Sequence, residues 1–313
     1  MKYRTNFALP CIFAICMAAA LRTASGDEPA SGAKPRTEAD YLRDEYRAEA
    51  EKHAFFLDDE KRQPLKLVDH PIMSWSNDGQ WSGDVFLWTS AGRPAIIGCM
   101  LSGPGAKDLR YVFDEFHLVA DKPIAPAELQ TRRRWAPERG LAVEPLTGAP
   151  APAATAPARL TQMRKISRNF TAHMQANVAS ELRLLPQPLF RYGTGDGRKA
   201  ASTEDAPEVR PTGEQADVLD GALFTYVWTL GTDPELILLL ECRRTAEGFA
   251  WHYAPVRFSN RALWLKHDGR EVWRVEGHAE PQTAATSLLY TTAFSRSIPV
   301  REPTAKVEKP DSK

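Results

Sequence analysis

The stretch that decides the fold is Val85–Val119, VFLWTSAGRPAIIGCMLSGPGAKDLRYVFDEFHLV. It contains three runs rich in aromatic and branched residues, Val85–Ser90, Ala95–Ser102 and Leu109–Val119. Glycine and proline separate these runs, and such residues are typical of the turns between strands. The connections are too short for the crossover that joins parallel strands, so the stretch predicts three antiparallel strands.

A similar stretch follows later in the chain. Phe86–Leu118 matches Tyr226–Phe258 at a constant spacing of 140 residues, which pairs Trp88 with Trp228. The two stretches share the order of their aromatic residues and prolines, and this favours an internal duplication over a chance likeness.

A helix-like stretch precedes each set of strands. Thr37–Leu57 and Ala158–Ser180 carry apolar residues at helical spacing, and we interpret both stripes as packing against a sheet. We therefore predict an α+β fold with two similar helix-plus-antiparallel-sheet halves, produced by tandem internal duplication. Its outline is cystatin-like, and a likeness of outline carries no function.

Composition divides the chain into segments. Residues 37–147 form the first predicted half, and 159–276 form the second, with an Ala/Pro linker at 148–158 between them. Residues 193–218 have little to bury and predict a mobile insertion. Residues 277–313 are mostly polar and predict a mostly flexible tail.

The chain begins with the pattern of a secretory signal peptide, residues 1–26. Lys2 and Arg4 precede an apolar run at Ala8–Leu21, and small residues end at Gly26, where we expect cleavage. The run of 14 residues is shorter than the roughly 20 residues of a membrane-spanning helix. We therefore expect an exported, periplasmic or extracellular protein with no transmembrane segment after signal removal.

The charge of the processed chain argues against two classes of partner. Cleavage removes Lys2, Arg4 and Arg22 and no acid, which leaves 37 basic and 40 acidic residues and a net charge of −3. This balance does not favour nucleic acid or an anionic membrane. Cys99 and Cys242 remain, and their offset in the matched strands puts them on opposite faces, so we expect no disulfide between them.

The best candidate for chemistry is the string DEFH at 114–117. On a strand Glu115 and His117 share one face, as an acid–base pair or two metal ligands would, and Asp114 is the alternative acid. Two ligands are too few for a metal, and the sequence predicts neither a metal nor a cofactor. The alternative is that these are polar strand residues without a role in chemistry. The second stretch favours this alternative, because its matching positions differ: Ala254, Pro255 and Arg257.

The chain has eight tryptophans, enough for an aromatic ligand platform. Trp88 and Trp228 are the candidate ligand-binding residues, because the repeat pairs them. Core packing is the favoured interpretation of both, since aromatic side chains dominate core energetics.

Four strings carry a family resemblance: WTSAGRP at 88–94, ELRLLPQPLFRY at 181–192, DGALF at 220–224 and EVWRV at 271–275. They resemble exported bacterial proteins that have no assigned function. The resemblance covers most of the chain that follows the signal peptide. It implies kinship and adds no activity and no catalytic residue.

These observations favour an exported, non-enzymatic binding or scaffold protein over an enzyme. Its partner would be a protein, a glycan or a small apolar ligand held by the sheet. One alternative is an exported hydrolase or isomerase that uses His117 with Glu115 or Asp114. Another is a structural partner in an envelope assembly, which would use sheet edges or an apolar patch.

Overall fold

The computed structural model describes residues 36–58, 64–129, 133–193, 217–229, 231–278 and 288–300. The predicted signal peptide, residues 1–26, lies outside the described residues, and so does most of the predicted insertion 193–218. Neither helix in the described part of the chain has the length and apolar character that crossing a membrane requires.

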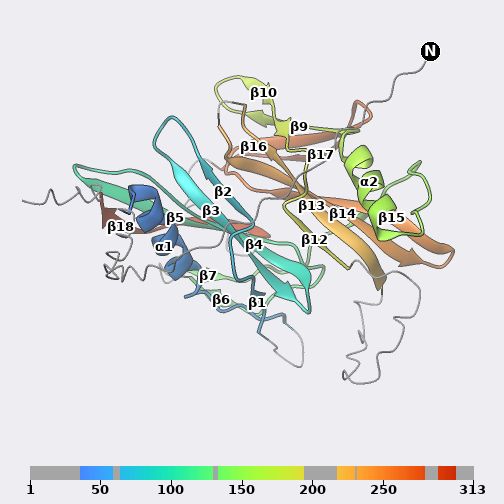
Figure 1. Cartoon of the computed structure of the whole chain (residues 1–313), viewed down its shortest axis with the longest axis horizontal. Helices are drawn as coiled ribbons and strands as arrows, with labels where there is room; N and C mark the ends of the chain where they lie inside the picture. The colour runs from blue at the N-terminus through green and yellow to red at the C-terminus, as the bar shows by residue number, and fades with distance from the viewer. Residues whose placement is uncertain are drawn as a thin grey trace, which may run out of the picture. The chain divides into compact units, whose positions relative to one another are not determined.

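Two long antiparallel sheets form the centre of the fold (Figure 1). The first has the order β1-β3-β4-β5-β18, and β2 also pairs with β3. Its strands are β1 Lys66–Leu67, β2 Met73–Ser76, β3 Ser82–Ser90, β4 Arg93–Pro104, β5 Leu109–Leu118 and β18 Tyr290–Pro299. The three central strands are those predicted from Val85–Val119, and their antiparallel pairing is confirmed.

The second long sheet has the order β11-β13-β14-β15-β8, and β12 also pairs with β13. Its strands are β8 Glu144–Pro145, β11 Arg183–Leu184, β12 Phe190–Tyr192, β13 Val218–Val227, β14 Pro234–Thr245 and β15 Gly248–Arg257. Each long sheet thus takes one edge strand from a distant part of the chain, β18 in the first and β8 in the second.

Two smaller sheets and two helices complete the described structure. A four-stranded sheet has the order β10-β9-β16-β17, and β6 pairs with β7 in a two-stranded sheet. Their bounds are β6 Ala127–Glu128, β7 Arg134–Trp135, β9 Phe170–Gln175, β10 Ala179–Glu181, β16 Ala262–His267 and β17 Arg270–Val275. The helices are α1, Glu38–Ala50, on β3 and β4, and α2, Ala156–Ser167, on β13 and β14.

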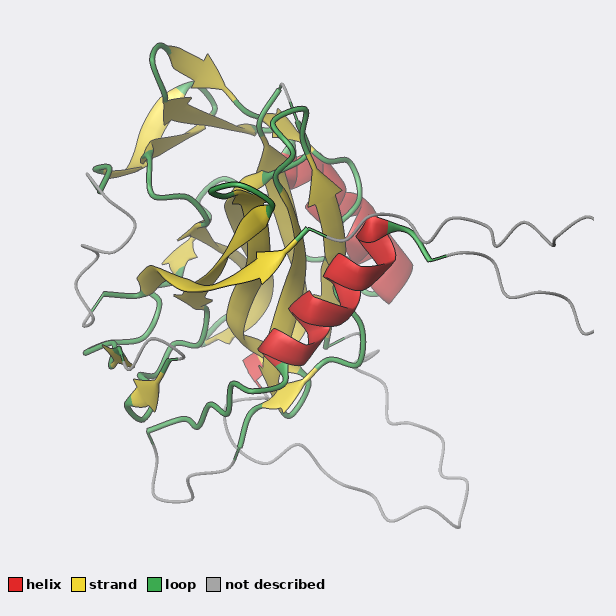
Figure 2. Cartoon of the chain, turned by 90° about the vertical axis from the view of Figure 1, so that its left-hand side faces the viewer, coloured by secondary structure: helices red, strands yellow, loops and turns green. Residues whose placement is uncertain are grey.

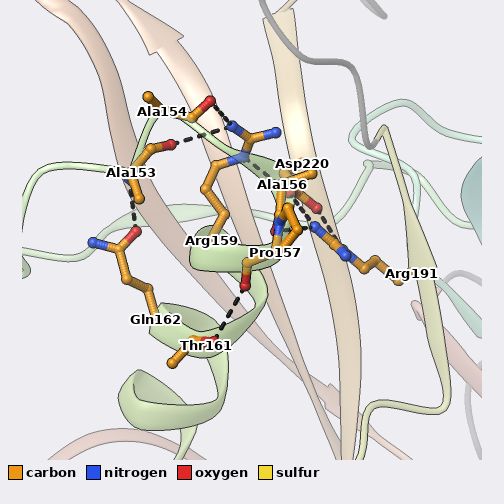
Figure 3. A network of polar contacts seen from close by, with 9 residues as sticks. All are labelled: Ala153, Ala154, Ala156, Pro157, Arg159, Thr161, Gln162, Arg191 and Asp220. Carbon is orange, nitrogen blue, oxygen red and sulfur yellow. Dashed lines mark hydrogen bonds and ion pairs between the residues drawn. The ribbon is translucent and has the colours of Figure 1, made fainter.

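Both helices are fixed to their sheets by polar contacts as well as apolar ones. On α1 the Tyr46 hydroxyl lies 2.6 Å from the Ser102 hydroxyl of β4. On α2 the buried Arg159 donates to Asp220 of β13 over 2.9 Å, and Arg191 donates to the same carboxylate over 2.7 Å (Figure 3). These buried charges are paired and hydrogen-bonded, as burial in an apolar layer requires.

The two faces of each long sheet are both covered. On β3, Phe86 and Trp88 belong to the core under α1, whereas Val85 and Leu87 belong to a core that also includes Leu239 of β14. The inner faces of the two long sheets therefore pack against each other, and each outer face lies under a helix. This double burial explains why β3 and β14 carry continuous apolar runs, Val85–Trp88 and Leu236–Leu240, instead of alternating apolar and polar residues.

The predicted α+β class, with two similar helix-plus-sheet halves of cystatin-like outline, is wrong. The described chain has two short helices and is mostly antiparallel β-sheet; strands dominate the view in Figure 2. A helix covers only one face of a sheet, and the continuous apolar strands required cover for the second face as well. The other sheet provides it, so the long sheets do not form separate helix-over-sheet units.

The second predicted helix, Ala158–Ser180, is half strand. Helix α2 ends at Ser167, and β9 follows with Phe170, Ala172 and Met174 buried in alternation. Phe170 and Met174 are four residues apart, a spacing that satisfies both the helical period and the strand period of two. The local pattern therefore could not separate the two structures.

Two further expectations differ from the structure. Tyr290–Pro299, inside the predicted flexible tail, is strand β18 and pairs with β5. The strand register contradicts the predicted match of Trp88 with Trp228. Ile96 of β4 pairs with Trp88 of β3. Leu236 of β14, the predicted counterpart of Ile96, pairs with Tyr226 of β13 and not with Trp228. A register shift lies beside each of these pairs, so the constant spacing of 140 residues is not kept in β13.

Candidate functional site

The predicted catalytic residues lie on two different faces of strand β5. Phe113 and Glu115 line a cleft, His117 lies further along the same face in a second hollow, and Asp114 lies on the opposite face near His53. The alternation of side chains along a strand accounts for this division. Glu115 and His117 share the face that the sequence predicted, while Asp114 faces away from both.

The cleft lies between the first and second long sheets and has a volume of about 350 Å³. Six aromatic side chains line its walls: Trp75, Trp81, Phe113, Trp228, Phe258 and Tyr290. Three carboxyl groups line it as well, from Glu115, Asp233 and Glu235. An apolar pocket with a few converging polar groups is the usual form of a small-molecule site.

Two glycines make room for the tryptophans of the cleft. A Cβ atom on Gly103 of β4 would lie 2.3 Å from the indole ring of Trp81. A Cβ atom on Gly83 of β3 would lie 2.9 Å from Nε1 of Trp75, which donates to Sγ of Cys99 over 3.3 Å. The absence of side chains at these two positions lets both rings lie close to the sheet.

Glu115 is buried and has a hydroxyl as its hydrogen-bond partner. The Tyr290 hydroxyl of β18 donates to its Oε1 over 2.6 Å. Burial raises the pKa of Glu115 to about 7, and the Tyr290 hydrogen bond and the charge of Arg257 only partly oppose the shift. A carboxyl group in this setting exchanges its proton near neutral pH.

Glu235 and Asp233 approach the cleft from the start of β14. Burial raises the pKa of Glu235 to about 8; the Ser259 hydrogen bond opposes this shift, while the nearby charges of Asp233 and Glu115 add to it. Asn77 donates to Oδ2 of Asp233 over 3.0 Å, whereas Oδ1 of Asp233 is buried without a hydrogen-bond partner among the described residues. The cleft therefore holds two acids with raised pKa values and one acid with an unused acceptor.

His117 lies in the second hollow, and Tyr290 lines both this hollow and the cleft. Nδ1 of His117 is 2.7 Å from the carbonyl oxygen of Leu118, and burial lowers the pKa of His117 to about 3. Arg257 and His278 lie in the same hollow, with 3.1 Å between Nη1 of Arg257 and Nε2 of His278. A histidine that stays neutral and bonds to the backbone is a structural group more than a proton carrier.

One cluster in the described chain has the residue types of a metal site. Ligand atoms of Glu49, His53 and Asp114 lie within 4.8 Å of one another, and all three residues are buried. Glu49 already pairs with Lys52 over 3.1 Å and with Arg296. Two cations next to the only glutamate of the cluster oppose the binding of a third, so we interpret it as an ion-pair cluster that joins α1 to β18.

The two candidate tryptophans lie in different surroundings. Trp228 is partly buried and lines the cleft. Trp88 is buried under α1, with its ring centroid 5.2 Å from that of Phe55, and is not part of the cleft. The structure thus separates the pair that the sequence treated as equivalent.

Sequence reasoning missed most of the cleft. Trp75, Trp81, Asp233, Glu235 and Tyr290 were not candidates. One signal was present: Glu235 opens the apolar run LILLL of β14, and an acid at the start of a strand buried on both faces is unusual. Tyr290 had no such signal, because it lies 175 residues from Glu115 in the chain.

Comparisons with known proteins give no further guidance. No protein-family model, no curated protein and no solved structure matches this chain. The function must therefore be argued from the site.

Proposed function

We propose that this chain is an exported binding protein that holds a small molecule in the cleft between its two long sheets. One observation carries the proposal: six aromatic side chains and three carboxyl groups converge on one cavity of about 350 Å³. Aromatic walls provide most of the contact area in such sites, and the few polar groups orient the ligand.

The proposal is tested with the uncharged dye N-phenylnaphthylamine, whose fluorescence rises in apolar surroundings. We expect saturable binding of one dye molecule, and we expect Trp81→Leu to weaken it at least about tenfold by removing one wall. Trp273→Leu is the matched control, because Trp273 lines the second hollow and not the cleft. Dye binding that depends on Trp273 and not on Trp81 would place the ligand site elsewhere.

A second candidate function is acid–base catalysis in the same cleft, as in a hydrolase or isomerase. The raised pKa values of Glu115 and Glu235 favour it, because a general acid or base works best near its operating pH. In this version Tyr290 positions the Glu115 carboxyl group, and His117 takes no part. The candidate requires a substrate turnover that Glu115→Gln abolishes while the dye still binds.

A further inference from the structure

We infer that the ligand of the cleft is a small organic cation, whose ammonium group lies between the tryptophan rings and the carboxylates of Glu115, Asp233 and Glu235. This inference rests on the proposed function, because it names the ligand class of the same cleft. Three features of the cleft support it: its charge balance, its aromatic faces and its buried carboxyl groups.

The charge balance of the cleft is acidic. Three carboxyl groups line it, and Arg261 is the basic residue that lines it. Arg257 is close by, but its guanidinium donates to the carbonyl oxygens of Ser259 and Arg261, each over 2.6 Å. Arg257 lies in the second hollow, and its charge offsets that of Glu115 only in part, so a bound cation would supply the remaining charge.

The aromatic walls provide the second argument. A cation over the face of an indole ring is attracted by the ring quadrupole, and tryptophan is the strongest of the aromatic residues in this respect. Trp228 already has such a contact: the guanidinium carbon of Arg261 lies 5.8 Å from the centroid of its ring. Trp75 and Trp81 offer two more indole rings to the same space.

The carboxyl groups provide the third argument. Glu115 and Glu235 are 8% and 7% exposed, and both line the cavity. Oδ1 of Asp233 is buried without a hydrogen-bond partner in the described residues. Buried carboxyl groups without a cation are costly, so a positively charged ligand gains more from this site than a neutral one of equal size.

Binding of a cation is coupled to loss of a proton. Glu115 faces Tyr290 of β18, Arg257 of β15, Cys99 of β4 and Glu235 of β14. Glu235 faces Asp233 and Arg261 as well. With pKa values of about 7 and about 8, Glu115 is about half protonated and Glu235 mostly protonated at neutral pH, and both are protonated in acid. A cation favours their ionised forms, so its affinity rises with pH until both are ionised.

The experiment compares two probes of the same shape, choline and dimethylbutanol, in which a carbon atom replaces the nitrogen. We expect choline to bind at least about tenfold more tightly by calorimetry. Repeating the titration in buffers of different ionisation enthalpy should show proton release on choline binding, and its affinity should increase between about pH 6 and about pH 9.

Two variants sharpen the comparison. Glu235→Gln keeps the shape of the cleft and should lower choline affinity about tenfold while leaving dimethylbutanol unchanged. Glu271→Gln is the control, because Glu271 is an exposed acid paired with Arg274 away from the cleft. Equal affinity for the two probes, or a loss with Glu271→Gln as large as with Glu235→Gln, would overturn the inference.

The dye experiment separates this failure from failure of the proposed function. If N-phenylnaphthylamine binding depends on Trp81 but choline has no advantage, the cleft is a binding site and its ligand is not a cation. If dye binding is insensitive to Trp81, the proposed function itself is wrong and the cation inference falls with it.

Discussion

The interface between the two long sheets holds two buried glutamates in opposite circumstances. Glu241 of β14 accepts from Arg93 of the first sheet over 2.9 Å, from Arg243 over 2.7 Å and from the Tyr192 hydroxyl over 2.6 Å. Although burial alone would raise the pKa of Glu241, the two guanidinium groups lower it. Glu115 is buried as well, and burial raises its pKa, because a phenol and a single nearby guanidinium oppose the shift less than the partners of Glu241 do.

The difference separates a structural acid from a candidate functional one. Glu241 joins the two sheets, because its partner Arg93 belongs to the first sheet. Arg93 also pairs with Asp121, and Arg243 donates to the same Asp121. Every charged side chain in this group is paired with one of opposite charge. Glu115 and its neighbour Glu235 instead reduce stability at neutral pH, and buried groups of this kind are concentrated at functional sites. The following predictions test whether the contrast is real.

The largest expected effect comes from Glu241→Gln, which leaves Arg93 and Arg243 in the interface without their carboxylate. We expect a loss of about 3 kcal/mol in the free energy of unfolding at neutral pH, measured with urea, because breaking a buried ion pair leaves charge uncompensated. The lowered pKa means that this contribution is present above about pH 4.5 and is lost as the pH falls through the folded value. The variant and the parent should therefore converge in acid.

The control for this substitution is Glu271→Gln, at an exposed ion pair with Arg274. It should leave the unfolding midpoint unchanged, since exposed pairs contribute little. A loss below about 1 kcal/mol for Glu241→Gln would show that Glu241 is not the structural acid we describe.

Gly103→Ala should have the next largest effect, and it alters the cleft without touching its acids. The new methyl group would meet the Trp81 ring, so we expect a loss of about 2 kcal/mol in unfolding free energy and weaker dye binding. The double variant with Trp81→Leu tests the cause. If Trp81 is the residue displaced, Gly103→Ala should cost much less in the Trp81→Leu background, and additive losses would contradict the packing described here.

Glu235→Gln should stabilise the protein, in contrast to Glu241→Gln. Because the folded pKa of Glu235 is about 8, the folded chain holds a proton that the unfolded chain releases at lower pH, and stability falls as the pH rises toward 8. Each unit of pKa difference corresponds to about 1.4 kcal/mol, so we expect a gain of at least ~1 kcal/mol at about pH 8 and almost none at about pH 4, below the ordinary glutamate pKa of 4.5. Glu247→Gln, at an exposed residue, should show no such pH-dependent gain over the parent. A gain for Glu235→Gln that is the same at both pH values would refute the raised pKa.

The sequence could predict the strands of the cleft but not the cleft itself. Apolar runs bounded by glycine and proline located β3, β4 and β5. These are local signals. The contact of Glu115 with Tyr290 and Glu235 depends on which strand forms the edge of the first sheet and on which faces of the two sheets pack together. Local periodicity in the sequence predicts neither.

The smallest expected effect belongs to His117→Gln, and it bears on the alternative in which His117 works with Glu115. The two side chains share a face of β5, but His117 lines the second hollow and bonds to the backbone at Leu118. We expect the affinity of the cleft for choline or the dye to stay within about threefold, since Tyr290 separates the two spaces. Gln keeps a polar group near Leu118, so any loss of folding is limited and the binding measurement remains interpretable. A loss of tenfold or more, with an unchanged unfolding midpoint, would mean that the hollow and the cleft act as one site. The pair of His117 with Glu115 would then replace the pair of Glu115 with Glu235 as the centre of the chemistry.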